Sequence, residues 1–155
     1  MLFRSTNAGA SMGEKILVRR IGRVSGEAVT EYMHRTNKDL PPQVGVLVAT
    51  DAAGAEVARD VAMHIAAFTP AYLSRDEVPA DVVENERRIA QETAENEGKP
   101  EKAIPKIVEG RLNGFFKENC LLDQAFAKDP KKTVGQIAEE VGGTVTGFVR
   151  FRVGS

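Results

Sequence analysis

The feature that most constrains the fold is a pair of adjacent helical segments, because the first is too polar to be surrounded by protein. Residues 80–97 are rich in helix formers, yet their large apolar side chains are only Val82, Val83 and Ile89. A helix with so narrow an apolar stripe buries one side only. Beyond the turn Gly98-Lys99-Pro100, the next segment carries a complementary stripe: Ile104, Val108, Leu112 and Phe115, flanked by Ile107 and Phe116. We therefore predict an antiparallel helical hairpin that protrudes from the rest of the chain.

Segments on both sides of this hairpin have the two-residue period of strands. Strands are expected over residues 15–24, 28–35, 44–49 and 145–153, and the turn Ser25-Gly26 should join the first two as a β-hairpin. In the second strand one face carries Ala28, Thr30, Tyr32 and His34. In the last strand the face predicted to be buried carries Val145, Gly147, Val149, Phe151 and Val153.

The remaining segments have helical spacing. An apolar stripe predicts a helix over residues 55–69, ended by Pro70: Val57, Val61, Ile65 and Phe68. Ser74 and Glu77 have the spacing of a capping box, Glu84 is placed to pair with Arg88, and Thr133 should cap a helix over residues 134–141. We predict an α+β fold, an antiparallel sheet backed by helices. Its expected parts are a disordered lead-in (1–12), a core (13–79 and 119–155) and the hairpin (80–118).

Composition excludes several classes of protein. A formal net charge of -1 argues against a strongly basic nucleic-acid binder, and a single cysteine excludes an internal disulfide framework and indicates a reducing, cytoplasmic compartment. Two histidines and one cysteine cannot build a usual structural zinc site. No apolar stretch approaches the ~20 residues of a membrane span. We expect no metal, no cofactor and no membrane association.

The candidate reactive residues each have two interpretations. His64 is either a general base oriented by Asp60 or, as we favour, a boundary histidine paired with a local carboxylate. Cys120 is either an exposed thiol at a subunit interface or, as we favour, a buried small hydrophobe. Gly110 and Gly114 should permit close helix packing. The sequence has no phosphate-binding loop, dinucleotide fingerprint or nucleophile elbow, so we assign no catalytic residue.

A cluster of basic residues leaves a second function open. These residues are either a solvated face or a patch for RNA or an acidic protein surface: Arg19, Arg20, Arg23, Lys128, Lys131, Lys132, Arg150 and Arg152. Few aromatic residues are interleaved with them, so stacking on single-stranded nucleic acid is poorly supported.

Many stretches resemble elongation factor Ts, in unbroken order from about Gly13 to Gly154. They include GEKI at 13–16, YMH at 32–34, DVAMHIAA at 60–67, YLSRDEVP at 72–79 and VVENERR at 82–88. The most specific are EGKP at 97–100, KIVEGRLNGFF at 106–116 and TVTGFVRFRV at 144–153. The chain is most similar to actinobacterial members, and residues 1–11 resemble nothing in the family's preceding segment.

The resemblance implies a function without covalent chemistry. Elongation factor Ts binds elongation factor Tu in its GDP form, loosens the nucleotide and its magnesium, and so catalyses exchange for GTP. The family's N-terminal helical domain and Thr-Asp-Phe-Val motif have no counterpart in these residues, and the nearest analogue, Ala49-Thr50-Asp51-Ala52, lacks the Phe. A truncated product that binds elongation factor Tu weakly, without driving exchange, is expected. The alternatives are an RNA- or ribosome-binding module and an inert structural fragment.

The resemblance also implies which residues touch the partner. They are Met12, where Ile is usual, Gly13, His34, and Ala127 and Lys128, which replace larger apolar residues. This part of the family is expected to face domain 3 of elongation factor Tu, with no direct contact to nucleic acid. A homodimer is expected through the helical hairpin or the region of Cys120.

Overall fold

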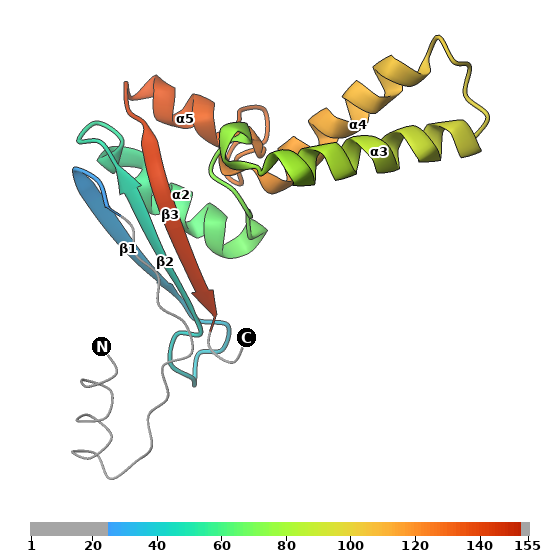
Figure 1. The fold of residues 1–155 in the computed structure, drawn as a ribbon. Helices are drawn as coiled ribbons and strands as arrows, with labels where there is room; N and C mark the ends of the chain where they lie inside the picture. The colour runs from blue at the N-terminus through green and yellow to red at the C-terminus, as the bar shows by residue number, and fades with distance from the viewer. Residues whose placement is uncertain (1–24, 153–155) are drawn as a thin grey trace.

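The computed structural model describes residues 25–152 and has the expected α+β architecture. Within residues 25–152, three strands form one antiparallel sheet in the order β1-β2-β3: β1 (Ala28–His34), β2 (Val44–Thr50) and β3 (Val145–Arg152) (Figure 1). The strand expected over residues 15–24, and its β-hairpin with residues 28–35, lie outside the described residues.

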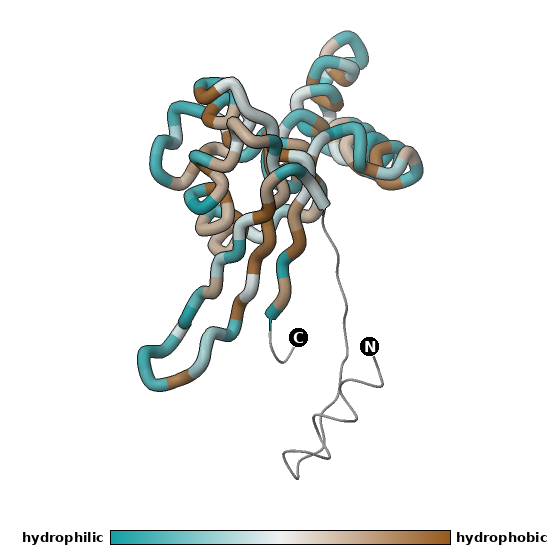
Figure 2. The backbone as a smooth tube through the Cα atoms, turned by 90° about the vertical axis from the view of Figure 1, so that its left-hand side faces the viewer, coloured by the Kyte–Doolittle hydropathy of each residue, from teal (hydrophilic) through white to brown (hydrophobic). Residues whose placement is uncertain are grey.

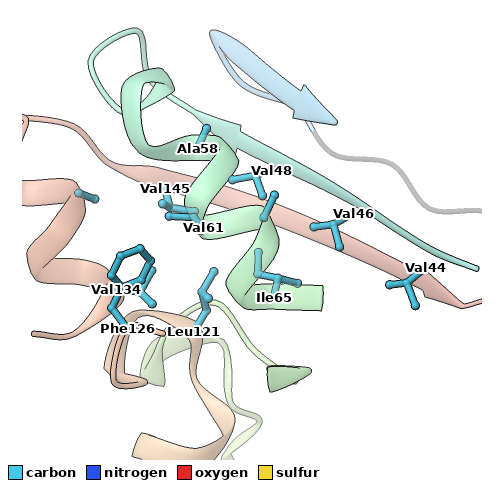
Figure 3. Close-up of a cluster of buried hydrophobic side chains, with 12 residues drawn as sticks. Val44, Val46, Val48, Ala58, Val61, Ile65, Leu121, Phe126, Val134 and Val145 are labelled. Atoms are coloured by element: carbon cyan, nitrogen blue, oxygen red, sulfur yellow. The ribbon is translucent and has the colours of Figure 1, made fainter. Parts of the chain in front are cut away.

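A helix packed on one face of the sheet makes the main core. The helix α2 (Ala55–Phe68) follows β2 after a short turn and runs back along the sheet. It buries Val61 and Ile65 against alternate valines of β2, because successive strand residues point to opposite faces. Figure 3 shows the resulting cluster, in which all labelled side chains are buried: Val44, Val46, Val48, Ala58, Val61, Ile65, Leu121, Phe126, Val134 and Val145.

The face of β3 that meets this core differs from the prediction. Val48 pairs with Phe148 and Val46 with Arg150, but Thr50 pairs with Val145, because a register shift lies between Ala49 and Thr50. One extra residue on β3 therefore places Val145 and Phe148 on the same side of the sheet. Val145 and Phe148 both join the core. The prediction that Gly147, Val149 and Phe151 share the buried face with Val145 is therefore wrong. Val153 lies outside the described residues.

The helical hairpin is present and projects from the core (Figure 1). It consists of α3 (Ala80–Asn96) and α4 (Ile104–Asn119), which enclose a cluster of their own. Its buried members are Ala90, Val108 and Leu112, with Val83, Ile104 and Phe116 packed against them. In Figure 2 hydrophobic and hydrophilic residues alternate along both helices, as expected where only one side is buried.

Three details of the hairpin were predicted wrongly. Ile89 is 43% exposed, and the small residues Ala90 and Ala94 are buried in its place. A Cβ at Gly110 or Gly114 would meet nothing within 4 Å, so these glycines do not serve close packing. Arg88 pairs with Glu92, and Arg87 pairs with Glu84.

Short segments link the hairpin to the core. The turns are η1 (Arg75–Glu77) and η2 (Leu121–Asp123), followed by α5 (Val134–Glu140). Thr133 and Gln136 form the full capping box of α5. The capping box expected at Ser74 is absent, because the Ser74 side chain makes no capping bond and Glu77 accepts from the backbone N–H of Leu73 instead.

Candidate functional site

The loop between η2 and α5 holds two of the predicted contact residues, Ala127 and Lys128, on the surface beside α2. Both residues are exposed, while Phe126 between them and η2 is buried in the core. The Lys128 ammonium lies 2.5 Å from a carboxylate oxygen of Asp60 on α2. The backbone N–H of Phe126 donates to the carbonyl of Lys132, which closes the loop. The pair is thus presented on a folded loop that is tied to a helix.

His64 of α2 lies directly behind this loop. Its side chain is buried, 1% exposed, and its ring stacks on Phe68 with centroids 4.7 Å apart. Nδ1 accepts from the backbone N–H of Ala127 at 3.2 Å, and Nε2 lies 2.8 Å from Oε1 of Gln124. Burial lowers the pKa of His64 below its ordinary value, and the bond with Gln124 opposes this in part.

Both sequence interpretations of His64 are therefore wrong. Each expected Asp60, one turn earlier, to pair with the imidazole. Asp60 instead binds Lys128, and the partners of His64 come from a segment sixty residues away. A buried imidazole whose two nitrogens are both bonded within the protein has no nitrogen free to act as a base on an external substrate.

His34, the other predicted contact residue that the structure describes, lies at the end of β1. Its ring is exposed, and Nδ1 is 3.1 Å from the hydroxyl oxygen of Tyr32. His34 pairs with Val44, so it shares the α2 side of the sheet with the Ala127–Lys128 loop. Among the described residues, no hydrogen bond or ion pair joins His34 to that loop. Met12 and Gly13 lie outside the described residues.

Sequence reasoning missed two apolar residues on the exposed side of α2. Phe68, predicted to be in the core, is 52% exposed, and Met63 is 39% exposed. Phe68 ends the helix and stacks on His64, so it lies between the core and solvent. Its position in the sequence could have indicated this exposure, because Phe68 falls in the last helical turn before Pro70. At that point the apolar stripe of the helix extends beyond the edge of the sheet.

Cys120 has the buried environment that we favoured. It is fully buried at the end of α4, where its backbone N–H donates to the carbonyl of Phe116. Burial is the main factor that raises the pKa of its thiol, and the carboxylate of Asp123 adds to it. The alternative of an exposed thiol at a subunit interface is wrong, while self-association through the helical hairpin or the region around Cys120 stays a prediction.

Two of the described residues of the basic cluster, Lys128 and Lys132, are paired with carboxylates. Lys132 pairs with Glu140 and Asp129, as Lys128 does with Asp60. The guanidinium of Arg150 donates to the backbone carbonyl of Ala66 under α2. Arg19, Arg20 and Arg23 lie outside the described residues. The described basic groups therefore favour a solvated, paired surface over a phosphate-binding patch.

Residues 25–152 lack two further features. That part of the chain contains no group of three or more His, Cys, Asp or Glu side chains able to hold a metal ion. None of its helices is both long and apolar enough to cross a membrane.

Comparison with known proteins gives one consistent family. The family model for elongation factor TS matches residues 4–155, so the match includes most of the segment for which no counterpart was expected. Relatives named elongation factor Ts are 67% identical in Beutenbergia cavernae, over 96% of this chain and 53% of the relative, and 62% identical in Micrococcus luteus, over 97% and 55%. The relative in Thermobifida fusca is 62% identical, over 94% and 52%. The chain spans about half the length of these relatives.

Proposed function

The chain belongs to the elongation factor Ts family of translation factors, and from that premise we propose that its core is a docking surface for elongation factor Tu in the GDP form. In the cytoplasm the family's role is to promote the exchange of GDP for GTP. A partner that binds the nucleotide-free GTPase more tightly than the GDP form weakens nucleotide binding by the same factor, so no catalytic residue is needed.

The observation that carries the proposal is the anchoring of the Ala127–Lys128 loop. The backbone N–H of Ala127 is held by Nδ1 of His64, and the ammonium of Lys128 is held by the carboxylate of Asp60. Binding sites are commonly loops held by a rigid scaffold, because a loop that is already ordered loses little entropy on binding. Exposed Phe68, which stacks on His64, adds apolar area to this surface.

A second part of the proposal is that these 155 residues bind without driving exchange. They contain no Thr-Asp-Phe-Val motif. In the nearest analogue, Ala49-Thr50-Asp51-Ala52, the aspartate is hydrogen-bonded within the fold. The carboxylate of Asp51 accepts from the backbone N–H groups of Gly54 and Thr144, at 2.8 and 3.0 Å. These bonds hold the pKa of Asp51 below its ordinary value, Thr144 contributing most. Asp51 thus joins the start of α2 to the residue that precedes β3.

The test separates binding from exchange. Elongation factor Tu loaded with a fluorescent GDP is mixed with the 155-residue chain, and binding is followed by calorimetry while nucleotide release is followed by fluorescence. We expect measurable binding with almost no acceleration of release, and clear acceleration by a full-length relative. Strong acceleration by this chain would refute the second part of the proposal, and lack of binding would refute the first.

Single substitutions test the proposed contact residues. Lys128→Ala and His34→Ala should each weaken binding several-fold, since exposed contacts contribute about 1 kcal/mol or less. Lys131→Ala, on the same loop, is the matched control and should bind like the unmodified chain. Equal affinity of all three variants would remove Lys128 and His34 from the surface.

A further inference from the structure

The hydrogen bonds around His64 have one consistent direction. The backbone N–H of Ala127 can only donate, so Nδ1 of His64 carries no proton and the neutral ring carries its proton on Nε2. Nε2–H then donates to Oε1 of Gln124, and the amide nitrogen of Gln124 donates to the carbonyl of Glu118 at 2.7 Å. The chain of hydrogen bonds thus runs from the Ala127–Lys128 loop through His64 of α2 to the last turn of α4.

We propose that His64 is a positioning residue that holds the Ala127–Lys128 loop in its docking conformation through its Nε2–H tautomer. The inference rests on the proposed function, because the loop it positions is the proposed contact with elongation factor Tu. His64 itself touches no partner, since its side chain is 1% exposed.

The burial of the ring argues for this role. An imidazole placed between aromatic rings loses its hydration, and its two nitrogens must be satisfied within the protein. Phe68 and Phe126 stack on the ring, with centroids 4.7 and 6.0 Å away, and set its plane. Both nitrogens are bonded to the segment that leads into and forms the loop, Gln124 and Ala127. The polar atoms of this residue therefore serve the loop.

Two substitutions separate the nitrogens. The amide of Asn reaches the position of Nδ1, and the amide of Gln reaches that of Nε2. His64→Asn keeps an acceptor for Ala127 and loses the donor to Gln124, while His64→Gln does the opposite. We expect His64→Gln to weaken binding to elongation factor Tu-GDP about fivefold, the value of one hydrogen bond, and His64→Asn to weaken it less. Thermal unfolding of both variants shows how far each destabilises the fold.

A second measurement does not depend on the partner. Amide hydrogen exchange at Ala127 in the free chain should be faster in His64→Gln than in His64→Asn. Unchanged exchange in His64→Gln would overturn the inference, and so would faster exchange with unchanged affinity. Lack of binding by the unmodified chain would refute the proposed function and the docking role with it, while exchange at Ala127 would still show whether His64 holds the loop.

The unmodified chain provides a check if a variant fails to fold. Nitrogen-15 chemical shifts and two-bond couplings of the His64 ring distinguish the two neutral tautomers. The Nε2–H tautomer at pH 7 is the expected result. A proton on Nδ1 would overturn the inference, because that nitrogen could not then accept from Ala127.

Discussion

Two opposing influences meet at His64: burial disfavours the charged ring, and the bond with Gln124 favours it. Burial is the larger, so the folded pKa lies below the unfolded value of 6.5. The charged groups Asp60 on α2 and Lys128 on the loop bind each other, which offsets much of their joint effect on the ring. On the η2 side Asp123 is paired with Arg75.

A dependence of stability on pH follows from this shift. Below pH 6.5 the unfolded chain binds a proton that the folded chain resists, so the free energy of unfolding should fall as the pH drops from 6.5 through the folded pKa. Above pH 6.5 this contribution is fully present. Urea denaturation between pH 5 and 7.5 measures the slope, and His64→Asn should lose the part that belongs to the imidazole. The same slope in both proteins would contradict the prediction.

Two glycines should respond oppositely to the same added methyl group. A Cβ at Gly143 would lie 2.3 Å from the backbone nitrogen of Gly54, so Gly143→Ala should cost about 1–3 kcal/mol by forcing the backbone apart. A Cβ at Gly110 would meet open space within α4, so Gly110→Ala should gain about 0.5–1 kcal/mol by removing a flexible residue from a helix. Chemical denaturation gives both values, and a stabilised Gly143→Ala would contradict this account.

At the level of elements, regular patterns could be predicted and irregularities could not. The stripes of 57–65 and 104–112 follow from helical spacing alone, and both helices are present. The bulge in β3 has no counterpart in the local pattern, because alternation from Val145 to Phe151 is regular in sequence. Pairing with β2 determines which residues face α2, and it is a long-range property.

The same limit applies to the candidate site. Position in an apolar helix placed His64 near the core, and the family resemblance indicated Ala127 and Lys128. The contact between them depends on the chain returning to α2 after the whole helical hairpin. Sequence spacing carries no information on that approach, and Asp60, four residues from His64, was the nearer but wrong choice of partner.

Arg75 is one of the links between the hairpin and the core, beside backbone hydrogen bonds such as that from Tyr72 to Asn119. Its guanidinium donates to Asp123 of η2 and to Asn113 of α4, both at 3.0 Å, and lies 4.9 Å from the ring centre of Phe116. The side chain is 44% exposed, so solvent screens the ion pair. Loss of the three contacts by Arg75→Ala should cost about 1 kcal/mol.

The more specific consequence of Arg75→Ala is a wider range of hairpin orientations. Spin labels at positions 29 and 99, on the core sheet and the hairpin turn, would report the distance distribution by electron paramagnetic resonance; Cys120 is buried and should stay unlabelled. Arg75→Ala should broaden the distribution. Arg88→Ala, whose contacts with Glu92 and Asn85 stay within α3, is the control and should not. Equal widths would show that other contacts fix the hairpin.

For the molecule as a whole, the decisive feature is that the core and the hairpin have separate hydrophobic clusters. In the described part of the chain, the core cluster has twelve buried residues and the hairpin cluster has three, Ala90, Val108 and Leu112. Elements with few buried apolar contacts open at a lower free energy than the global unfolding reaction. The hairpin should therefore exchange its amide hydrogens faster than α2 and β2.

Matched core substitutions test this separation. Leu112→Ala removes a side chain that is 6% exposed from the hairpin cluster, and Ile65→Ala removes a fully buried one from the core. Each should cost about 2–5 kcal/mol locally. Leu112→Ala should accelerate exchange in α3 and α4 while leaving α2 and β2 protected, whereas Ile65→Ala should lower protection throughout, because the hairpin emerges from segments anchored in that core. If Leu112→Ala accelerated amide exchange in α2 and β2 as much as in α3 and α4, the two clusters would unfold as one unit. The hairpin could not then move independently while the core stays docked.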